Sequence, residues 1–319
     1  MSLLFIVDPL AKLKEYKDST VAMMREAARR GHAIFACTLD ELAYSAVVRA
    51  SAHRLRITHE AEPWYEDLGS DVAPLTAFDA VLMRKDPPFD VEFLNATLLL
   101  SQARAEGARV INDPQALRDH NEKLAIAEFP QFIAPTLVTR DIGLIRQFHR
   151  EHGDIVVKPL DGMGGSGVFR LTASDPNLNS ILETITAQGQ RTVMAQRYIP
   201  EIVDGDKRVL LIAGEAVPYC LARIPAPGES RGNLAAGGTG RAQPLSDNDR
   251  RIAAALGPAL AARGLLLVGL DVIGNNLTEV NVTSPTCFVE ITEQTGFCVA
   301  GMFIDALEKE IAGAGRATT

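Results

Sequence analysis

The chain contains the stretch Val156-Val157-Lys158-Pro159-Leu160-Asp161-Gly162-Met163-Gly164-Gly165-Ser166-Gly167-Val168, which predicts a strand, a glycine-rich turn and a second strand. Glycines allow backbone N–H groups to surround an anion at places where a Cβ atom would collide with it. Lys158 adds a positive charge that can reach the same oxygens. The stretch therefore predicts a site for the phosphates of a nucleoside triphosphate.

Other nucleotide-binding motifs fit this stretch less well. The spacing Gly162-x-Gly164-x-x-Gly167 also matches the dinucleotide-binding fingerprint, but that motif needs a helix after the glycines, and residues 168–171 predict a strand. A Walker loop is excluded because no lysine and hydroxyl pair follows the last glycine, and the signature loops of protein kinases do not occur downstream. A glycine-rich hairpin without a ligand is the alternative that stays open.

A second motif lies nearer the C-terminus. The apolar runs 265–273 and 277–282 flank Gly274-Asn275-Asn276, which predicts a β-hairpin with a loop of those residues. In that register Asp271 lies opposite Glu279, and Asn281 shares the face of Glu279 because strand side chains alternate. Such oxygen ligands suit Mg²⁺, which takes its remaining ligands from water and phosphates. The alternative is a merely polar hairpin face, although carboxylates that face each other repel unless a cation separates them.

Composition limits the class of protein. With 319 residues, 47% of them hydrophobic, the chain can bury a sizeable core and is expected to divide into about two or three units. Its net charge of −8 argues against nucleic acid or an anionic membrane as the main partner. The four cysteines, Cys37, Cys220, Cys287 and Cys298, have no paired short spacing, which indicates reduced thiols in a cytoplasmic protein. Residues 1–10 predict a first strand and no signal peptide, and no apolar run is long enough to span a membrane.

The order of the expected elements indicates an α/β protein. Strands at 3–7 and 33–37 flank a helix at 19–30, and strands at 80–83 and 109–111 flank a helix at 91–106, which is typical of an open parallel sheet. The turn at 112–114 is expected to lead into a short helix that carries Lys123. A second α/β unit, from about 135 to 200, holds the glycine-rich stretch, and a closing helix is expected near 301–312.

The segment from Ile224 to Arg241 contains too many prolines and glycines for a regular element. Long loops of this kind in compact domains are usually functional lids or disordered segments. Arg231 and Asn233 give the loop groups that can contact anions, so we favour a lid over a passive linker.

Six blocks of sequence carry a resemblance to a known family. They are residues 83–90, Asn121-Glu122-Lys123-Leu124, residues 158–165, Asp204-Gly205-Asp206-Lys207-Arg208, residues 231–238 and Asn281-Val282-Thr283-Ser284-Pro285-Thr286. Together with Asp271 and Glu279, these blocks resemble the ATP-grasp superfamily and, within it, the bacterial glutathione synthetases. The resemblance covers most of the chain, but no motif is recognised from Cys37 to Leu75 or after Gly301.

The resemblance implies an α/β fold, α+β in its C-terminal part, in which an ATP-grasp fold follows an N-terminal domain with an open parallel sheet. The implied units are an N-terminal α/β domain (1–120), a small ATP-grasp lid subdomain with the glycine-rich loop (121–200) and a C-terminal subdomain with the metal site and a flexible loop at 224–241 (201–319). It also implies a cytoplasmic homotetramer, which no residue shows independently, with neither nucleic acid nor a membrane as partner.

The implied reaction is the ATP-dependent ligation of γ-glutamylcysteine and glycine to glutathione, ADP and phosphate. The cysteinyl carboxylate attacks the γ-phosphate to give an acyl phosphate, and the glycine amine then attacks the activated carbonyl and expels phosphate. Two anions meet in the first step, so lysines and Mg²⁺ would neutralise the charge on the transferred group. Two Mg²⁺ ions with ATP are implied, with Mn²⁺ as a possible substitute, and the closed loop would keep water from the hydrolysable intermediate.

The resemblance assigns roles to individual residues, which group by ligand. Contacts with ATP are implied for Lys123, Lys158, Gly162, Met163, Gly164, Gly165, Gln196, Tyr198, Ile199 and Asp206. Metal ligands are Asp271, Glu279 and Asn281, and catalytic groups are Arg208, Arg223 and Arg231. Contacts with the dipeptide or glycine are implied for Ser19, Arg84, Arg223, Arg231, Asn281 and Ser284. On the sequence alone, Ser19 is equally an ordinary helix N-cap, and Arg208 and Arg223 are equally partners in surface salt bridges.

Two other functions stay open. One is another ligase of the superfamily, such as a D-alanine:D-alanine ligase or a glutamate-adding ligase. The other is a non-catalytic ATP-binding module like the synapsin C domain, against which the complete set of Asp271, Glu279 and Asn281 argues. The pair His149-x-x-His152 is expected on an exposed helix face rather than at zinc, and Cys287 is expected to be a core thiol.

Overall fold

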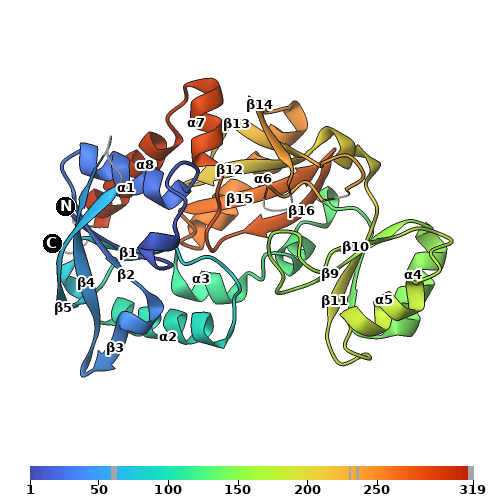
Figure 1. Ribbon diagram of the computed structural model, residues 1–319, viewed down its shortest axis with the longest axis horizontal. Helices are drawn as coiled ribbons and strands as arrows, with labels where there is room; N and C mark the ends of the chain where they lie inside the picture. Colours follow the sequence, from blue (N-terminus) through green and yellow to red (C-terminus); the bar gives the residue numbers. More distant parts are fainter. Residues whose placement is uncertain (59–62, 230, 235–236, 315–319) are drawn as a thin grey trace.

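The computed structural model describes residues 1–58, 63–229, 231–234 and 237–314. Its strands form three separate sheets with helices packed around them, as Figure 1 shows. Short 3-10 helices occur between the elements: η1 (Leu10–Lys12), η2 (Leu39–Glu41), η3 (Leu75–Ala77), η4 (Leu124–Glu128), η5 (Pro130–Phe132) and η6 (Pro200–Asp204). Across the part of the chain just defined, no helix combines the length and apolar character needed to cross a membrane.

The first sheet lies in the N-terminal part of the chain. Its strands are β1 (Ser2–Ile6), β2 (Ala33–Cys37), β3 (Leu42–Ser45), β4 (Val47–Ile57), β5 (Tyr65–Pro74), β6 (Ala80–Met83) and β7 (Val110–Ile111). Their order is β3-β4-β2-β1-β6-β7, and β5 pairs with β4. β1 pairs in parallel with β2 and β6, and β6 with β7, so the expected parallel strands are confirmed.

This sheet also has an antiparallel part, in the region for which the sequence predicts no element. β4 runs antiparallel to β2, β3 and β5. Along β4, the buried residues Val48, Ala50 and Ala52 alternate with less buried ones. Alternation of this kind is typical of a strand that buries one face, so the sheet is mixed rather than parallel throughout.

Three helices accompany the first sheet: α1 (Ser19–Arg29), α2 (Val91–Ala105) and α3 (Pro114–Asp119). The Asp18 carboxylate accepts hydrogen bonds from the backbone N–H groups of Thr20 and Val21, at 2.7 and 3.0 Å. Asp18 is therefore the N-cap of α1, and the interpretation of Ser19 as the N-cap is wrong. The prediction that a short helix carries Lys123 is also wrong, because α3 ends at the non-helical His120 and Lys123 directly precedes η4.

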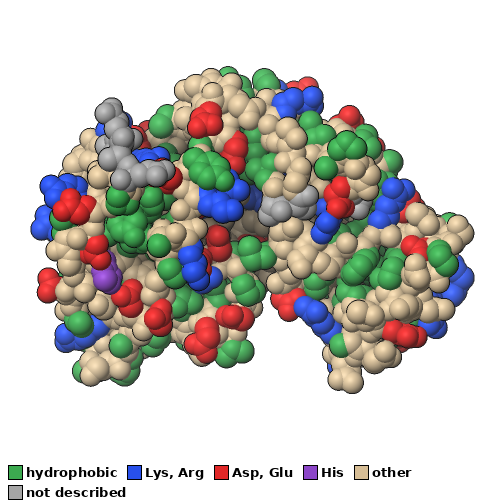
Figure 2. Space-filling view, in the orientation of Figure 1, with side chains coloured by type: hydrophobic (Ala, Val, Ile, Leu, Met, Phe, Trp, Pro, Cys, Tyr) green, Lys and Arg blue, Asp and Glu red, His purple; other side chains and the backbone are tan. Residues whose placement is uncertain are grey.

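The second sheet confirms the expected α/β unit. Its strands β8 (Thr136–Thr139), β9 (Ile155–Pro159), β10 (Phe169–Leu171) and β11 (Val193–Arg197) pair antiparallel in the order β10-β9-β11-β8. β9 and β10 flank the glycine-rich stretch, as predicted. With α4 (Ile142–His152) and α5 (Leu178–Ile185) these strands form a lobe around their own small core, and Figure 2 shows a deep notch between this lobe and the rest of the molecule.

The expected exposed face of α4 is only partly present. His149 is buried, and its Nε2 atom lies 2.9 Å from the carbonyl oxygen of Thr172. The prediction of an exposed His149 is therefore wrong, because the ring packs under the chain that follows β10.

The third sheet lies in the C-terminal part. Its strands β12 (Asp206–Ile212), β13 (Glu215–Ile224), β14 (Thr239–Pro244), β15 (Leu267–Ile273) and β16 (Asn276–Asn281) are antiparallel in the order β14-β13-β12-β15-β16, and α6 (Asp247–Ala262) packs against them. The expected irregular loop, 224–241, is shorter than predicted, because Ile224 ends β13 and residues 239–241 belong to β14. Residues 230 and 235–236 of that loop lie outside the described residues.

The hairpin of β15 and β16 has the expected partners but a different loop. Ile273 pairs with Asn276, so the turn holds two residues rather than the three predicted. A register shift next to Asp271 then admits one extra residue into β16, and this bulge restores the predicted pairing of Asp271 with Glu279. Gly274 in the turn has φ +56°, a conformation that glycine adopts without strain.

The helices α7 (Phe288–Thr295) and α8 (Val299–Ala314) return to the N-terminal sheet, where Figure 1 shows α8 beside α1. Phe288 and Phe303 belong to the same buried cluster as Leu3 and Phe5 of β1. Arg30, at the end of α1, links α1 to α8. Its Nη1 atom donates to Asp305 Oδ1 at 2.6 Å, and its Nη2 atom donates to the carbonyl oxygen of Gly301 at 3.0 Å. Segments from the two ends of the sequence therefore share one core.

Replacing Glu26 is expected to loosen this junction. Its carboxylate accepts hydrogen bonds from Arg29 and Arg30, and these arginines lower the pKa of Glu26 from 4.5 to about 2 although burial opposes them. A pKa below the unfolded value stabilises the fold fully above pH 4.5, and this contribution is lost as the pH falls towards 2. We expect Glu26→Gln to lower the free energy of unfolding by roughly 1–3 kcal/mol at pH 7, as measured by urea denaturation.

The difference from the wild type should shrink as the pH drops below 4.5. Glu310→Gln, an exposed change on α8, serves as the control and should leave the stability unchanged at every pH. Equal stability of Glu26→Gln and the wild type at pH 7 would contradict the assignment.

Candidate active site

A cavity of about 650 Å³ is lined by residues from all three parts of the chain. It brings together most of the residues singled out in the sequence: Lys123, Lys158, Gly162, Met163, Gly164, Gly165, Gln196, Tyr198, Ile199, Asp206, Arg208, Arg223, Arg231, Asp271, Glu279, Asn281 and Ser284. These residues are far apart in the sequence, so the folding of the whole chain assembles the cavity.

Two predicted substrate residues do not line the cavity. Arg84 is buried, donating from Nε to Thr20 Oγ1 at 3.1 Å and from Nη2 to the carbonyl oxygen of Pro285 at 3.0 Å. Burial lowers the pKa of Arg84 to about 10. Ser19 is buried too, and its hydroxyl accepts a hydrogen bond from the backbone N–H of Phe288 at 3.1 Å. Both side chains are therefore buried behind the cavity surface, where they bond to other parts of the protein. Their neighbours Lys17, Asp18, Lys85 and Asp86 line the cavity itself.

The glycine-rich loop meets the described part of the expected lid. Gly165 has φ +81°, a conformation that glycine adopts without strain, and a Cβ atom there would lie 2.8 Å from Asn233 Oδ1. Arg231 Nη1 donates to the carbonyl oxygen of Gly165 at 3.2 Å. Arg231 and Asn233, the two groups expected to contact anions, therefore lie at the turn that is expected to hold phosphates.

Two lysines converge on one carboxylate. The Nζ atoms of Lys123 and Lys158 lie 3.5 and 3.6 Å from Glu279 Oε1. Lys123 also donates to the carbonyl oxygen of Gly162 at 2.6 Å, which ties it to the glycine-rich loop. Burial and the positive charge of Lys123 lower the pKa of Lys158, while Glu279 raises it. Two buried ammonium groups this close together favour the binding of an anion between them.

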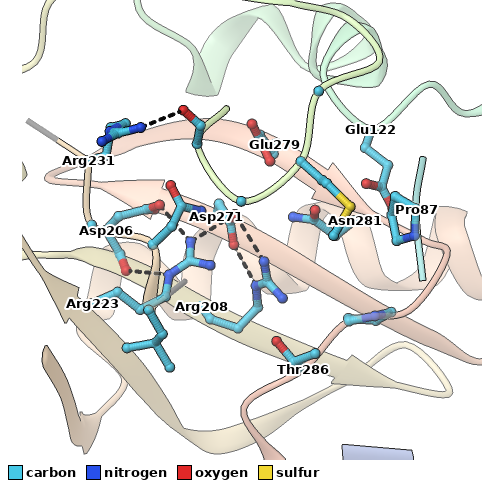
Figure 3. Close-up of a pocket in the computed structure, with 18 of the residues that line it drawn as sticks. Pro87, Glu122, Asp206, Arg208, Arg223, Arg231, Asp271, Glu279, Asn281 and Thr286 are labelled. Carbon is cyan, nitrogen blue, oxygen red and sulfur yellow. Dashed lines mark hydrogen bonds and ion pairs between the residues drawn. The ribbon is translucent and has the colours of Figure 1, made fainter. Parts of the chain in front are cut away.

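Two arginines bracket Asp271, as Figure 3 shows. Arg208 binds it with two hydrogen bonds, from Nε to Oδ1 at 2.6 Å and from Nη2 to Oδ2 at 3.1 Å. Arg223 Nη2 lies 2.8 Å from Asp271 Oδ2 and 2.6 Å from Asp206 Oδ2. Both guanidinium groups project from neighbouring strands into the cavity, where they can also donate to a bound anion. The alternative interpretation as surface salt bridges is wrong, because all four side chains are almost fully buried.

The same network sets the charge of the two aspartates. Burial alone raises the pKa of Asp271, but the adjacent Arg208 and Arg223 lower it well below its usual range. For Asp206, burial raises the pKa, and the negative charges of Asp271 and Glu279 raise it further, against the effect of Arg223. Asp206 Oδ1 is buried and accepts no hydrogen bond from the residues that the structure describes. The three carboxylates therefore lie near one another in the cavity, where Arg208 and Arg223 offset much of the charge of the two aspartates.

The donor set at this place suits a hard divalent cation. Asp271 and Glu279 pair across neighbouring strands, and Asn281 follows two residues later on the same face as Glu279. These are oxygen ligands, which Mg²⁺ prefers. Residues 1–58, 63–229, 231–234 and 237–314 contain no cluster of three or more His, Cys, Asp and Glu side chains arranged for a metal. A cation here would therefore need the Asn281 amide oxygen and ligands from a substrate in addition to the two carboxylates.

One side of the cavity is suited to a flat, apolar group. Val156, Ile199, Ile202 and Ile273 line it together with Gln196 and Tyr198 at the end of β11. Gln196 Nε2 donates to Thr136 Oγ1 at 3.0 Å, and Arg170 stacks over the Tyr198 ring at 3.7 Å from its centre. Fixed side chains around an apolar slot, with polar backbone groups at its edge, are typical of a site for a planar base.

Glu122 is a site residue for which the sequence predicts no role. Its Oε1 atom accepts three hydrogen bonds, from the backbone N–H groups of Val282 and Thr283 at 2.9 and 3.0 Å and from the Thr283 hydroxyl at 2.8 Å. Burial raises the pKa of Glu122, and these hydrogen bonds oppose the rise. Glu122 thus fixes the end of β16, while Lys123 beside it reaches Glu279 and the glycine-rich loop. The sequence offers no signal for this contact, because its partners lie 160 positions further along.

We expect Glu122→Ala to lower the free energy of unfolding by roughly 1–3 kcal/mol, because three buried donors lose their acceptor. Urea denaturation measures the change. Glu122→Gln should recover part of the loss, since its amide oxygen can still accept from the same groups. Glu201→Ala, a change at an exposed position of η6, is the control and should have little effect. Unchanged stability of Glu122→Ala would show that these hydrogen bonds contribute nothing.

Solved structures with a similar fold cover almost the whole chain. The crystal structure of D-cycloserine synthetase DcsG matches with a TM-score of 0.69 at 18% identity, covering 97% of this chain and 99% of that one. The ATP-grasp ligase PsnB, in complex with minimal precursor, Mg and ADP, matches with a TM-score of 0.62 at 17% identity, covering 98% of each chain. At these identities the likeness concerns the fold alone.

The fold, the paired lysines and the glycine-rich loop place the chain in the ATP-grasp class of proteins. Models of the two domains of one family match it: the N-terminal domain of prokaryotic glutathione synthetase at residues 1–118 and its ATP-grasp domain at residues 122–296. The chain belongs to the prokaryotic glutathione synthetase family.

Curated relatives agree with this placement. The glutathione synthetase of Ralstonia nicotianae is 64% identical over 310 residues, which cover 97% of this chain and 96% of the relative. The glutathione synthetase of Nitrosomonas europaea is 58% identical and covers 98% of this chain and 99% of its own length. The resemblance stated from the sequence motifs is therefore confirmed.

Proposed function

We propose that the chain is an ATP-dependent ligase that joins γ-glutamylcysteine to glycine and releases glutathione, ADP and phosphate. The observation that carries this proposal is one cavity in which Lys123, Lys158 and the glycine-rich loop face the carboxylates of Asp271 and Glu279, with Arg208 and Arg223 beside them. Membership of the glutathione synthetase family supports the choice of substrates.

In the proposed first step, two anions must approach each other. Lys123 and Lys158 would hold the phosphates of ATP, because their ammonium groups are buried beside the glycine-rich loop. Gly162, Met163, Gly164 and Gly165 would surround the same phosphates, and Gln196, Tyr198 and Ile199 would contact the base. Asp206, with one oxygen left over, would accept hydrogen bonds from the ribose hydroxyls. Fixing the nucleotide from several sides places its γ-phosphate for attack by a carboxylate.

The charge balance favours divalent cations as companions of ATP. In this part of the cavity the cations Lys123, Lys158, Arg208 and Arg223 face the anions Glu122, Asp206, Asp271 and Glu279. A triphosphate adds negative charge to an already balanced set, so it requires further positive charge. Asp271, Glu279 and Asn281 would hold Mg²⁺, for which Mn²⁺ would substitute, and two ions would accompany ATP. When bound, the metal would neutralise charge on the transferred phosphoryl group.

Arg208, Arg223 and Arg231 would serve the second step. Arg208 and Arg223 are held by Asp271 and Asp206, so they can donate to the acyl phosphate and to the oxyanion that forms when glycine attacks, without first being reoriented. Arg231 would close over the intermediate from the loop 224–241. Ser284 and Asn281, the latter also a proposed metal ligand, line the cavity and would contact the dipeptide or glycine. Ser19 and Arg84 would not touch the substrate. They would instead fix the position of the protein segments next to the proposed dipeptide site.

Several broader features stay part of the proposal. The division into 1–120, 121–200 and 201–319 is supported by the sheets, since each range contains one of them. The homotetramer and the cytoplasmic location rest on the resemblance alone. Small molecules are the proposed partners, with neither nucleic acid nor a membrane among them.

The test is phosphate release from Mg·ATP with γ-glutamylcysteine, with and without glycine, and with D-alanine as a competing substrate. Phosphate release that requires γ-glutamylcysteine and glycine, with matching glutathione, is the expected result. Turnover only with D-alanine would move the assignment to another ligase of the class. ATP binding without turnover would indicate a non-catalytic module.

A further inference from the structure

Glu290 lines the cavity but has no role in the mechanism above. It lies in the first turn of α7, and its Oε2 atom is buried and accepts no hydrogen bond among the described residues. Buried carboxylate oxygens in proteins almost always have a partner, because removing a charge from water without one is costly. The free oxygen therefore indicates a donor that comes from outside the chain.

The position of Glu290 relative to the arginines limits what that donor can be. Burial raises the pKa of the Glu290 carboxyl, while the positive charges of Lys17 and, less strongly, Arg208 lower it. Glu290 and Lys17, which belongs to the N-terminal part of the chain, therefore line the same region of the cavity. The base slot at Gln196 and Tyr198 belongs to the second sheet, on a different part of the chain.

A dipeptide oriented by the proposed reaction would bring a cation to this place. Its reacting carboxylate must meet the γ-phosphate near Arg208 and Arg223, so the rest of the molecule extends away from the nucleotide. The far end of γ-glutamylcysteine carries an α-ammonium and an α-carboxylate group. A buried carboxylate matches the first of these by a charge-assisted hydrogen bond.

We propose that Glu290 binds the α-ammonium group of the γ-glutamyl moiety and so selects dipeptides that carry it. The inference rests on the proposed function, because the reaction orients the substrate. Glu290 is thus a specificity-determining residue that contacts the substrate at a distance from the reacting atoms. An acidic residue in the first turn of a helix also stabilises that helix, and this is the role that the experiment must separate from substrate binding.

The experiment compares two substrates in two enzymes. One substrate is γ-glutamylcysteine, and the other is glutaryl-cysteine, which lacks only the α-amino group. We expect the wild type to show a kcat/KM for γ-glutamylcysteine about 10- to 100-fold above that for glutaryl-cysteine. Glu290→Gln should lose about the same factor with γ-glutamylcysteine and almost nothing with glutaryl-cysteine, which removes the preference.

Further variants separate binding from a structural role. Glu293→Gln, an exposed change on the same helix, is the matched control and should keep the preference. Glu290→Asp keeps the charge on a shorter side chain and should keep part of the preference, and it remains informative if Glu290→Gln unfolds. An equal loss with both substrates, or a preference that survives in both Glu290 variants, would overturn the inference. A wild type that forms no glutathione at all would instead overturn the proposed function, and the inference would fall with it.

Discussion

Glu279→Gln is expected to lower kcat for glutathione formation on the order of 10³-fold while the fold is kept. Glu279 would hold the metal with Asp271, and it is also the carboxylate that both buried lysines approach. Glutamine has nearly the same shape but no charge, so the proposed metal would lose a ligand and the two ammonium groups would repel each other without compensation. Each of these effects acts on the phosphoryl group during transfer.

Phosphate release at saturating substrates measures the change, and a Mg²⁺ titration of the remaining activity shows whether more metal is required. The matched control is Glu215→Gln, at an exposed position of β13 in the same sheet, which should behave like the wild type. Thermal unfolding should show that Glu279→Gln is folded. Activity close to the wild type at low Mg²⁺ would remove Glu279 from the metal site.

Arg208→Met is expected to lower kcat by about 10²–10³-fold and the free energy of unfolding by roughly 3 kcal/mol. Methionine retains much of the apolar stem, so the change removes mainly the guanidinium group. Asp271 then loses two of its hydrogen bonds inside the protein and is left with Arg223 alone. The proposed acyl phosphate would lose a donor that is held in place before the reaction begins.

Arg208→Lys helps to separate charge from geometry. Lysine restores the positive charge but cannot form the two parallel hydrogen bonds to Asp271, so we expect an activity between those of Arg208→Met and the wild type. Arg56→Met is the control, because Arg56 also forms an ion pair, with Glu66 at 2.5 Å, but at the surface. Its stability should change by about 1 kcal/mol at most. Equal losses of activity in Arg208→Met and Arg56→Met would contradict the role of Arg208.

The parts of the site that could be predicted from the sequence are those defined by neighbours in the chain. The strand, turn and strand around Lys158 and the pairing of Asp271 with Glu279 follow from short-range patterns, and both are present. Even there the hairpin loop is one residue shorter than predicted, and a bulge in β16 restores the predicted pairing. A local pattern does not show this bulge, because β15 also pairs with β12 on its other side.

The rest depends on contacts between distant segments, which no local pattern reveals. The hydrogen bonds of Glu122 with Val282 and Thr283 and the buried free oxygen of Glu290 are of this kind. The motif that contains Arg84 is recognisable, but the motif does not show that the guanidinium group turns into the wall towards Thr20 and Pro285. Buried and less buried residues alternate along β4, and this alternation was the local signal for the antiparallel strands β3 to β5 that were not predicted.

The packing of α7 and α8 on α1 and β1 has a consequence for biosynthesis. The ribosome releases the strands of the first sheet early, yet part of the apolar surface of that sheet is covered by residues 288–314. Domains usually complete folding as they emerge, starting from the N-terminus. Here β1 and β2 must remain partly open until residues 288–314 have also been translated. The nascent chain is therefore expected to expose aggregation-prone surface over most of its translation and to need protection by chaperones during that time.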